Sequence, residues 1–174
     1  ALRDAGDGAI IDISLLVRPD HENRWSALST QLAHGKSTQA VPIERIEFFA
    51  REGFVFVGAR RLMRELQPIY ENDTTVRLQD ASQYTDDIAV LRAAGFRWIL
   101  VSYRSGNERL PTHIVSELTG LCGPPVVEGR GFAAWELPAS TATDEQAAQW
   151  LEQHERWTLD NVEAYSRPQG PPLR

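Results

Sequence analysis

The chain has 174 residues, a formal net charge of −6 and a single cysteine. Its length suits one domain with a core of its own, and its 42% hydrophobic and 24% charged residues are ordinary for a globular protein. The negative charge and the scattered basic residues argue against a nucleic-acid partner. No apolar run is long enough to cross a membrane. Cys122 alone can form neither an internal disulfide nor a cysteine-based zinc site.

The first third of the chain is predicted to contain one strand and two helices. A β-branched apolar run predicts a buried strand over Ile10–Val17. Apolar residues at helical spacing predict a helix over residues 23–34, with Gly35 as its C-terminal cap, and a second helix over residues 42–53.

The middle third contains one ambiguous segment and two predicted helices. Phe54–Val57 fits either a short strand or a buried loop. Ala59–Leu66 is predicted to be a short helix, and it is expected to end before Pro68 because proline cannot donate a helical hydrogen bond. Acidic residues in a first turn predict a helix over Thr85–Ala94, which Gly95 ends.

The last third begins with the clearest strand pattern, over Arg97–Tyr103. A helix is predicted over Pro111–Leu121, and two strands over Val126–Glu128 and Phe132–Leu137 flank a glycine-rich turn, which predicts a β-hairpin. A C-terminal helix is predicted over residues 143–165.

These elements predict the α/β fold class, because a helix, a glycine and a strand in this order form the unit of such layers. We expect a layered sandwich with a mixed sheet of four strands or slightly more, a C-terminal β-hairpin and flanking helices. Residues 1–166 are predicted to form a single α/β domain, and the Pro/Gly-rich residues 167–174 a disordered tail.

The familiar catalytic and metal-binding patterns are incomplete in this sequence. His34-Gly35-Lys36-Ser37 resembles the end of a phosphate-binding loop, but the glycine that the motif requires five positions earlier is replaced by Thr30. The four histidines have no metal-ligand spacing, and no serine lies in a nucleophile elbow. The paired acids Asp86 and Asp87 suit the first turn of a helix. We therefore predict no catalytic residue, no metal and no cofactor.

Five tryptophans are many for this length. Trp98 and Trp135 lie in predicted strands and are expected in the core. Trp150 and Trp157 are seven residues apart on the C-terminal helix and share a face. They either anchor that helix on the domain or form an exposed platform for a sugar or a membrane interface.

The order of several segments over residues 9–138 resembles a known family. The segments are Asp12-Ile13-Ser14-Leu15, Gln31-Leu32-Ala33-His34-Gly35-Lys36, Pro42-Ile43-Glu44-Arg45, the run from Asp87 to Val101 and the hairpin that ends at Trp135-Glu136-Leu137. This pattern is similar to the C-terminal soluble region of polytopic, GT-C-type glycosyltransferase-like membrane proteins. The sequence departs from it at Ser14 and Ser37, where the family often has proline, and the C-terminal helix is not part of it.

The resemblance implies an accessory role on the extracytoplasmic, periplasmic side of a membrane. Such proteins use a polyprenyl-phosphate sugar donor, and their catalytic carboxylate lies in an early loop that has no counterpart in this chain. The domain would then cover the active site or seat the acceptor, with the transmembrane region of its parent chain as partner and a glycan or lipid-linked sugar as ligand. His34, Lys36 and Arg45 are the candidate ligand-binding residues on the motif side, with Trp150 and Trp157 on the last helix.

An alternative does not depend on the resemblance. Open α/β sheets bind ligands at the carboxyl ends of their strands. A stand-alone small-ligand-binding protein or enzyme would therefore have its site after the strand Arg97–Tyr103, near Tyr103 and Arg104.

Overall fold

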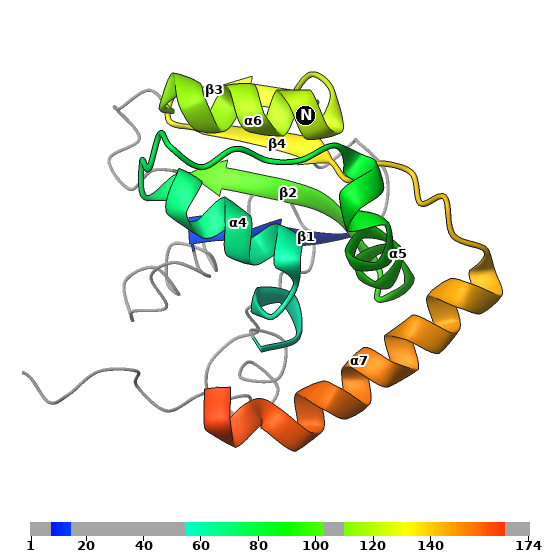
Figure 1. The fold of residues 1–174 in the computed structure, drawn as a ribbon. Helices are drawn as coiled ribbons and strands as arrows, with labels where there is room; N and C mark the ends of the chain where they lie inside the picture. Colours follow the sequence, from blue (N-terminus) through cyan, green and yellow to red (C-terminus); the bar gives the residue numbers. More distant parts are fainter. Residues whose placement is uncertain (1–7, 15–54, 103–109, 166–174) are drawn as a thin grey trace, which may run out of the picture.

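The computed structural model describes residues 8–14, 55–102 and 110–165 (Figure 1). The helices predicted over residues 23–34 and 42–53 lie outside this part of the chain, as does the tail predicted over 167–174.

The centre of the structure is a mixed four-stranded sheet, as the sequence predicts. Its strands are β1 (Ala9–Asp12), β2 (Phe96–Ser102), β3 (Val127–Gly129) and β4 (Phe132–Glu136), in the spatial order β1-β2-β4-β3. β1 runs parallel to β2, and β4 runs antiparallel to both β2 and β3. The predicted C-terminal hairpin is thus confirmed, and Gly131 supplies the positive φ of 80° at its turn.

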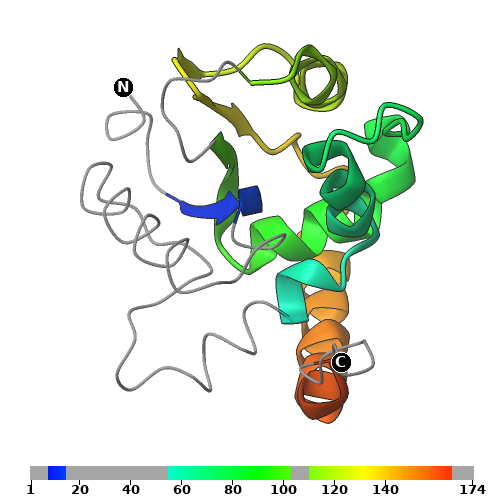
Figure 2. The same ribbon diagram turned by 90° about the vertical axis from the view of Figure 1, so that its left-hand side faces the viewer.

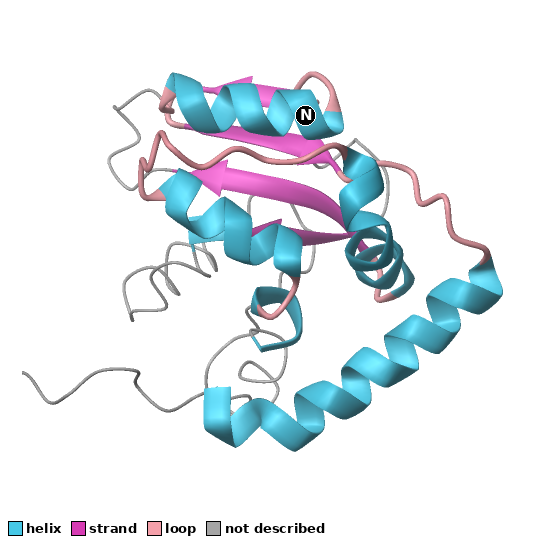
Figure 3. Ribbon diagram, viewed as in Figure 1, coloured by secondary structure: helices cyan, strands magenta, loops and turns pink. Residues whose placement is uncertain are grey.

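The described helices lie on one side of this sheet (Figure 2). They are α4 (Arg61–Tyr70), the 3-10 helix η2 (Ala81–Tyr84), α5 (Thr85–Ala93), α6 (Thr112–Cys122) and α7 (Asp144–Tyr165). Figure 3 shows that an extended loop joins β4 to α7, which packs mainly on α5. The helices predicted near α5, α6 and α7 are confirmed to within about one residue at each end.

The sheet is buried on both faces over its first strands. One face carries Ile11, Ile99 and Trp135 into the main core with the helices. Because side chains alternate along a strand, the intervening residues point to the opposite face. There Ile10 and Trp98 form a second, smaller buried cluster. Trp98 and Trp135 are therefore both core residues, as predicted, but on opposite faces.

The first strand ends earlier than predicted. We expected a strand over Ile10–Val17, but β1 stops at Asp12 and residues 13–14 are helical. The side chain of Asp12 explains the change, because it accepts hydrogen bonds from the backbone N–H and the hydroxyl of Ser14. An aspartate that binds the N–H group two residues ahead favours a turn over a continued strand.

Two predictions near α4 were wrong. Residues 55–58 are helical rather than strand or loop. α4 does not end before Pro68 but includes it and continues to Tyr70. A proline inside a helix costs about 3 kcal/mol, and Leu66 and Ile69 on its two sides are fully buried. Tertiary burial therefore overrides the local signal.

α7 packs through a single face. Its less exposed positions, among them Trp150, His154, Thr158 and Val162, recur at helical spacing. Trp150 packs against the main core, whereas Trp157 is 39% exposed. None of the described helices combines the length and apolar character that crossing a membrane requires.

Candidate functional site

The carboxyl ends of β1 and β2 lie at the same edge of the sheet because the two strands are parallel. Asp12, the last residue of β1, pairs with Leu100. Ser102, the last residue of β2, pairs with Phe132, the first residue of β4. The turn of the hairpin therefore also lies at this edge. Open α/β sheets bind ligands at such an edge, so we call it the carboxyl edge.

Strand alternation places three side chains of different chemistry on one face of this edge. Paired residues on neighbouring strands point to the same side, so Asp12 shares the face of Leu100, and Ser102 shares the face of Phe132. Leu100 and Ser102 are two residues apart and also share a face. This face thus carries a carboxyl, a hydroxyl and an aromatic ring. Strand spacing puts the Cα atoms of Asp12 and Phe132 roughly 12 Å apart.

Asp12 is the buried acid of this group, with 2% of its surface exposed. Its Oδ1 accepts the Ser14 backbone N–H at 3.0 Å and the Ser14 hydroxyl at 2.6 Å. Burial raises the pKa of the Asp12 carboxyl from 3.8 to about 6, although the two bonds from Ser14 oppose the rise. Asp12 therefore changes charge close to neutral pH, in the range where a carboxyl can exchange protons with a ligand.

Phe132 is the accessible aromatic group, with 40% of its surface exposed. Its ring lies over Gly129, the residue paired with it on β3, and a Cβ atom at Gly129 would clash with ring atoms Cε1 and Cζ. The glycine therefore determines where the ring can lie. Large aromatic groups are usually buried, and one held in place at a surface is a candidate contact for a ligand.

Ser102 lies between Asp12 and Phe132 and is half-buried. The hydroxyl of Tyr70, at the end of α4, donates a hydrogen bond of 3.0 Å to the Ser102 carbonyl. This bond ties the end of β2 to the helical layer. The backbone at the centre of the edge is thus fixed by long-range contacts as well as by strand pairing.

The residues that the sequence singled out are only partly placed. His34, Lys36 and Arg45 lie outside the described residues, and so do Tyr103 and Arg104, which directly follow Ser102. Trp150 and Trp157 belong to α7, which packs mainly on α5.

Asp12, Ser102 and Phe132 were not predicted as site residues. Asp12 was noted only within the family-like segment, and nothing in the sequence places it on the same face as the other two. The periodicity of each strand predicts which of its own residues share a face. Only the register between strands decides which residues of β1, β2 and β4 lie on the same face of the sheet.

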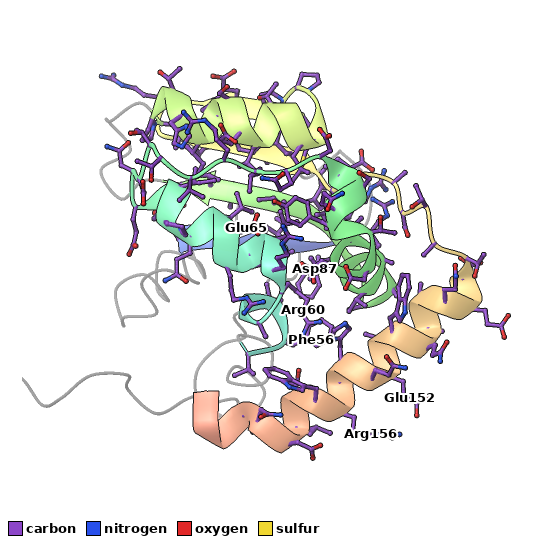
Figure 4. The ribbon with its side chains drawn as sticks, viewed as in Figure 1. Phe56, Arg60, Glu65, Asp87, Glu152 and Arg156 are labelled. Atoms are coloured by element: carbon purple, nitrogen blue, oxygen red, sulfur yellow. The ribbon has the colours of Figure 1, made fainter. Side chains whose placement is uncertain are left out.

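A second group of buried charges lies between α4, α5 and α7 (Figure 4). Asp87 on α5 accepts the backbone N–H of Leu62 at 2.7 Å and so caps the start of α4. Arg60 donates from Nε to the Phe56 carbonyl at 3.0 Å. Asp87 was predicted to be only a first-turn acid of its own helix, but it also holds a second helix in place. We assign this group a structural role.

Two further features bear on chemistry. Burial raises the pKa of the Cys122 thiol to about 12, so this cysteine is unreactive near neutral pH. Over residues 8–14, 55–102 and 110–165, no cluster of histidine, cysteine, aspartate and glutamate has the size needed to hold a metal ion. In comparisons with known proteins, no family model, no curated protein and no solved structure matches this chain.

Proposed function

We propose that this chain is an extracytoplasmic accessory domain of a membrane-bound, glycosyltransferase-like protein that uses a polyprenyl-phosphate sugar donor. In this role the carboxyl edge helps to seat the acceptor, and the transmembrane region of the parent chain is the partner. The sequence resemblance over residues 9–138 supports the class of parent protein. The site is supported by a single observation, the shared face of Asp12, Ser102 and Phe132.

The chemistry of this face suits a sugar. Sugar hydroxyls need hydrogen-bonding partners, and the C–H groups on the faces of sugar rings pack on aromatic side chains. Ser102 and Phe132 are the groups that reach solvent, and Asp12 lies behind them as a buried positioning residue that holds the turn at Ser14.

Binding is tested by titrating the chain with neutral disaccharides and measuring heat release. We expect a dissociation constant in the millimolar range or below, weakened severalfold by Asp12→Asn. The matched control is Asp144→Asn, because Asp144 is an exposed acid at the start of α7. Equal affinity in both variants, or no binding by the unmodified chain at millimolar sugar, would count against an acceptor seat at this edge.

The location is tested separately in the parent protein. Glu155 lies on the exposed side of α7, and Cys122 is too buried to react quickly. With Glu155→Cys, a membrane-impermeant maleimide should label the protein in intact cells, whereas the unmodified protein should remain unlabelled. Labelling only after the cells are lysed would place the domain inside the cell and refute the extracytoplasmic assignment.

A second candidate function is a stand-alone enzyme or small-ligand-binding protein with its site at the same edge, near Tyr103. The observation that favours it is the pKa of Asp12, which burial raises to about 6 and so to the range of a general acid or base. Turnover of a glycoside or ester by the purified chain, lost in Asp12→Asn, would favour this candidate. A chain that binds a sugar without turnover would favour the accessory domain.

A further inference from the structure

At the end of the β3–β4 hairpin, the ring of Phe132 lies against Gly129, an arrangement that strand pairing alone does not require. Phe132 is one of the most exposed large hydrophobic residues of the described chain, yet its ring lies over a glycine that leaves space for it. Gly129 is not at a positive φ, so the turn does not demand a glycine there. The missing side chain at Gly129 instead leaves the space that the ring of Phe132 occupies.

The surroundings of the ring indicate what it binds. Beside it on the same face is the hydroxyl of Ser102, and beyond that the buried acid Asp12. The residue paired with Phe132 on the neighbouring strand β2 is thus a serine, and its hydroxyl is the polar group nearest the ring along this face. A ring next to hydrogen-bonding groups suits a ligand with an apolar face and a hydroxylated rim.

We propose that Phe132, held over Gly129, is the stacking platform for an uncharged pyranose ring in an oligosaccharide acceptor. This inference rests on the proposed function and deepens it by naming the ligand class and the residue that selects it. The C–H face of the sugar packs on the Phe132 ring, and Ser102 meets a hydroxyl at the rim. An open-chain polyol has the same hydroxyls but no ring face, so it binds poorly.

The test compares neutral disaccharides (maltose, cellobiose and mannobiose) with sorbitol by NMR titration of the chain. At least one disaccharide should shift the Phe132 ring signals, while sorbitol at equal concentration should not. Phe132→Leu keeps an apolar side chain without a ring and should weaken disaccharide binding about tenfold, since a stacked ring contributes about that much to an equilibrium constant. Phe132→Trp should restore the binding.

Gly129→Ala provides a second, independent variant. It leaves Phe132 in place chemically but displaces its ring, so binding should weaken about as much as in Phe132→Leu. Two controls are matched to these variants. Gly120→Ala adds the same methyl group where there is open space, and Val126→Ala removes a 48% exposed apolar side chain from the same hairpin. Both controls should bind like the unmodified chain.

The outcomes separate this inference from the proposed function. If a disaccharide binds, and Asp12→Asn weakens it while Phe132→Leu and Gly129→Ala do not, the stacking platform is refuted and the acceptor seat stands. If sorbitol binds as well as the disaccharides, ring stacking is again refuted. If the unmodified chain binds no disaccharide at millimolar concentration, both proposals fail.

Discussion

Asp12 and Asp87 are both buried aspartates, with 2% and 4% of their surfaces exposed, but they serve different parts of the molecule. Asp87 accepts a backbone N–H from Leu62, twenty-five residues away, and so joins α5 to α4. Asp12 accepts two hydrogen bonds from Ser14, two residues away, at the end of β1. One acid connects helices, whereas the other shapes the carboxyl edge.

Burial raises the pKa of both carboxyls, but different groups oppose the rise at each one. The rise at Asp87 is opposed by the Leu62 N–H and by the nearby cations Arg60 and Arg64. The rise at Asp12, to about 6, is opposed by the two bonds from Ser14. The bond from Leu62 is the basis for assigning a structural role to Asp87, and the position of Asp12 on the carboxyl edge is the basis for proposing it as a site residue.

The largest effect is expected for Asp87→Ala. The variant leaves the buried Leu62 N–H without an acceptor and removes the cap of α4, so the free energy of unfolding should fall by about 3 kcal/mol. Urea unfolding at pH 7 measures this. The control Asp86→Ala removes the exposed neighbouring acid and should cost less than about 1 kcal/mol. Equal losses of unfolding free energy in the two variants would show that the bond from Leu62 to Asp87 does not stabilise the fold.

A smaller effect of opposite sign is expected for Asp12→Asn. Because the pKa of Asp12 is higher in the folded protein than its ordinary 3.8, the folded state binds more protons between about pH 4 and 6. The contribution of Asp12 to stability is therefore present below pH 4 and is lost as the pH rises through 6. Asparagine has no charge to desolvate, so the variant should be more stable by roughly 2 kcal/mol at pH 8 and nearly unchanged at pH 4.

Urea unfolding of both proteins at several pH values checks this prediction. A variant that is less stable than the unmodified chain at pH 8 would show that the Asp12 charge stabilises the fold. In that case Asp12, like Asp87, would be an acid that stabilises the fold.

The smallest effect is expected for His154→Gln on α7. Burial lowers the pKa of His154, and the Arg60 cation lowers it further, while Asp86 opposes the shift. The folded state thus favours neutral His154, and its contribution to stability is present above pH 6.5 and lost as the pH falls below that value. The variant should flatten the dependence of the melting temperature on pH between 5 and 7. Parallel curves for the two proteins would show that neither burial nor Arg60 lowers the pKa of His154 in the folded protein.

The fold could be predicted from the sequence where patterns are local. The strand predicted over Arg97–Tyr103 corresponds to β2, and the helix predicted to begin at Thr85 corresponds to α5. Both could be predicted because periodicity and helix-start signals depend on residues close together in the sequence. The helix through Pro68 could not be predicted, because its stability comes from burial of Leu66 and Ile69 in the tertiary structure. The end of β1 at Asp12 depends on a side-chain bond that competes with the strand.

The candidate site was less predictable than the fold. The rule for open sheets directed attention to the strand ends after Arg97–Tyr103, but the residues it named, Tyr103 and Arg104, lie outside the described residues. The sequence also directed attention to tryptophans because they are large, whereas the exposed ring at the edge is a phenylalanine. The pairing of Ser102 with Phe132 brings that ring to the carboxyl edge, and strand register is a property of the assembled sheet.

Sugar binding at the carboxyl edge is tested most directly by a map of backbone amide shifts in the unmodified chain during titration with a neutral disaccharide. A sugar bound at the carboxyl edge should shift the amide signals of Asp12, Ser14, Ser102 and Phe132 and leave those of Leu62 and Asp87 unchanged. Shifts confined to the surroundings of Leu62 and Asp87, or an unchanged spectrum at millimolar sugar, would contradict sugar binding at this edge.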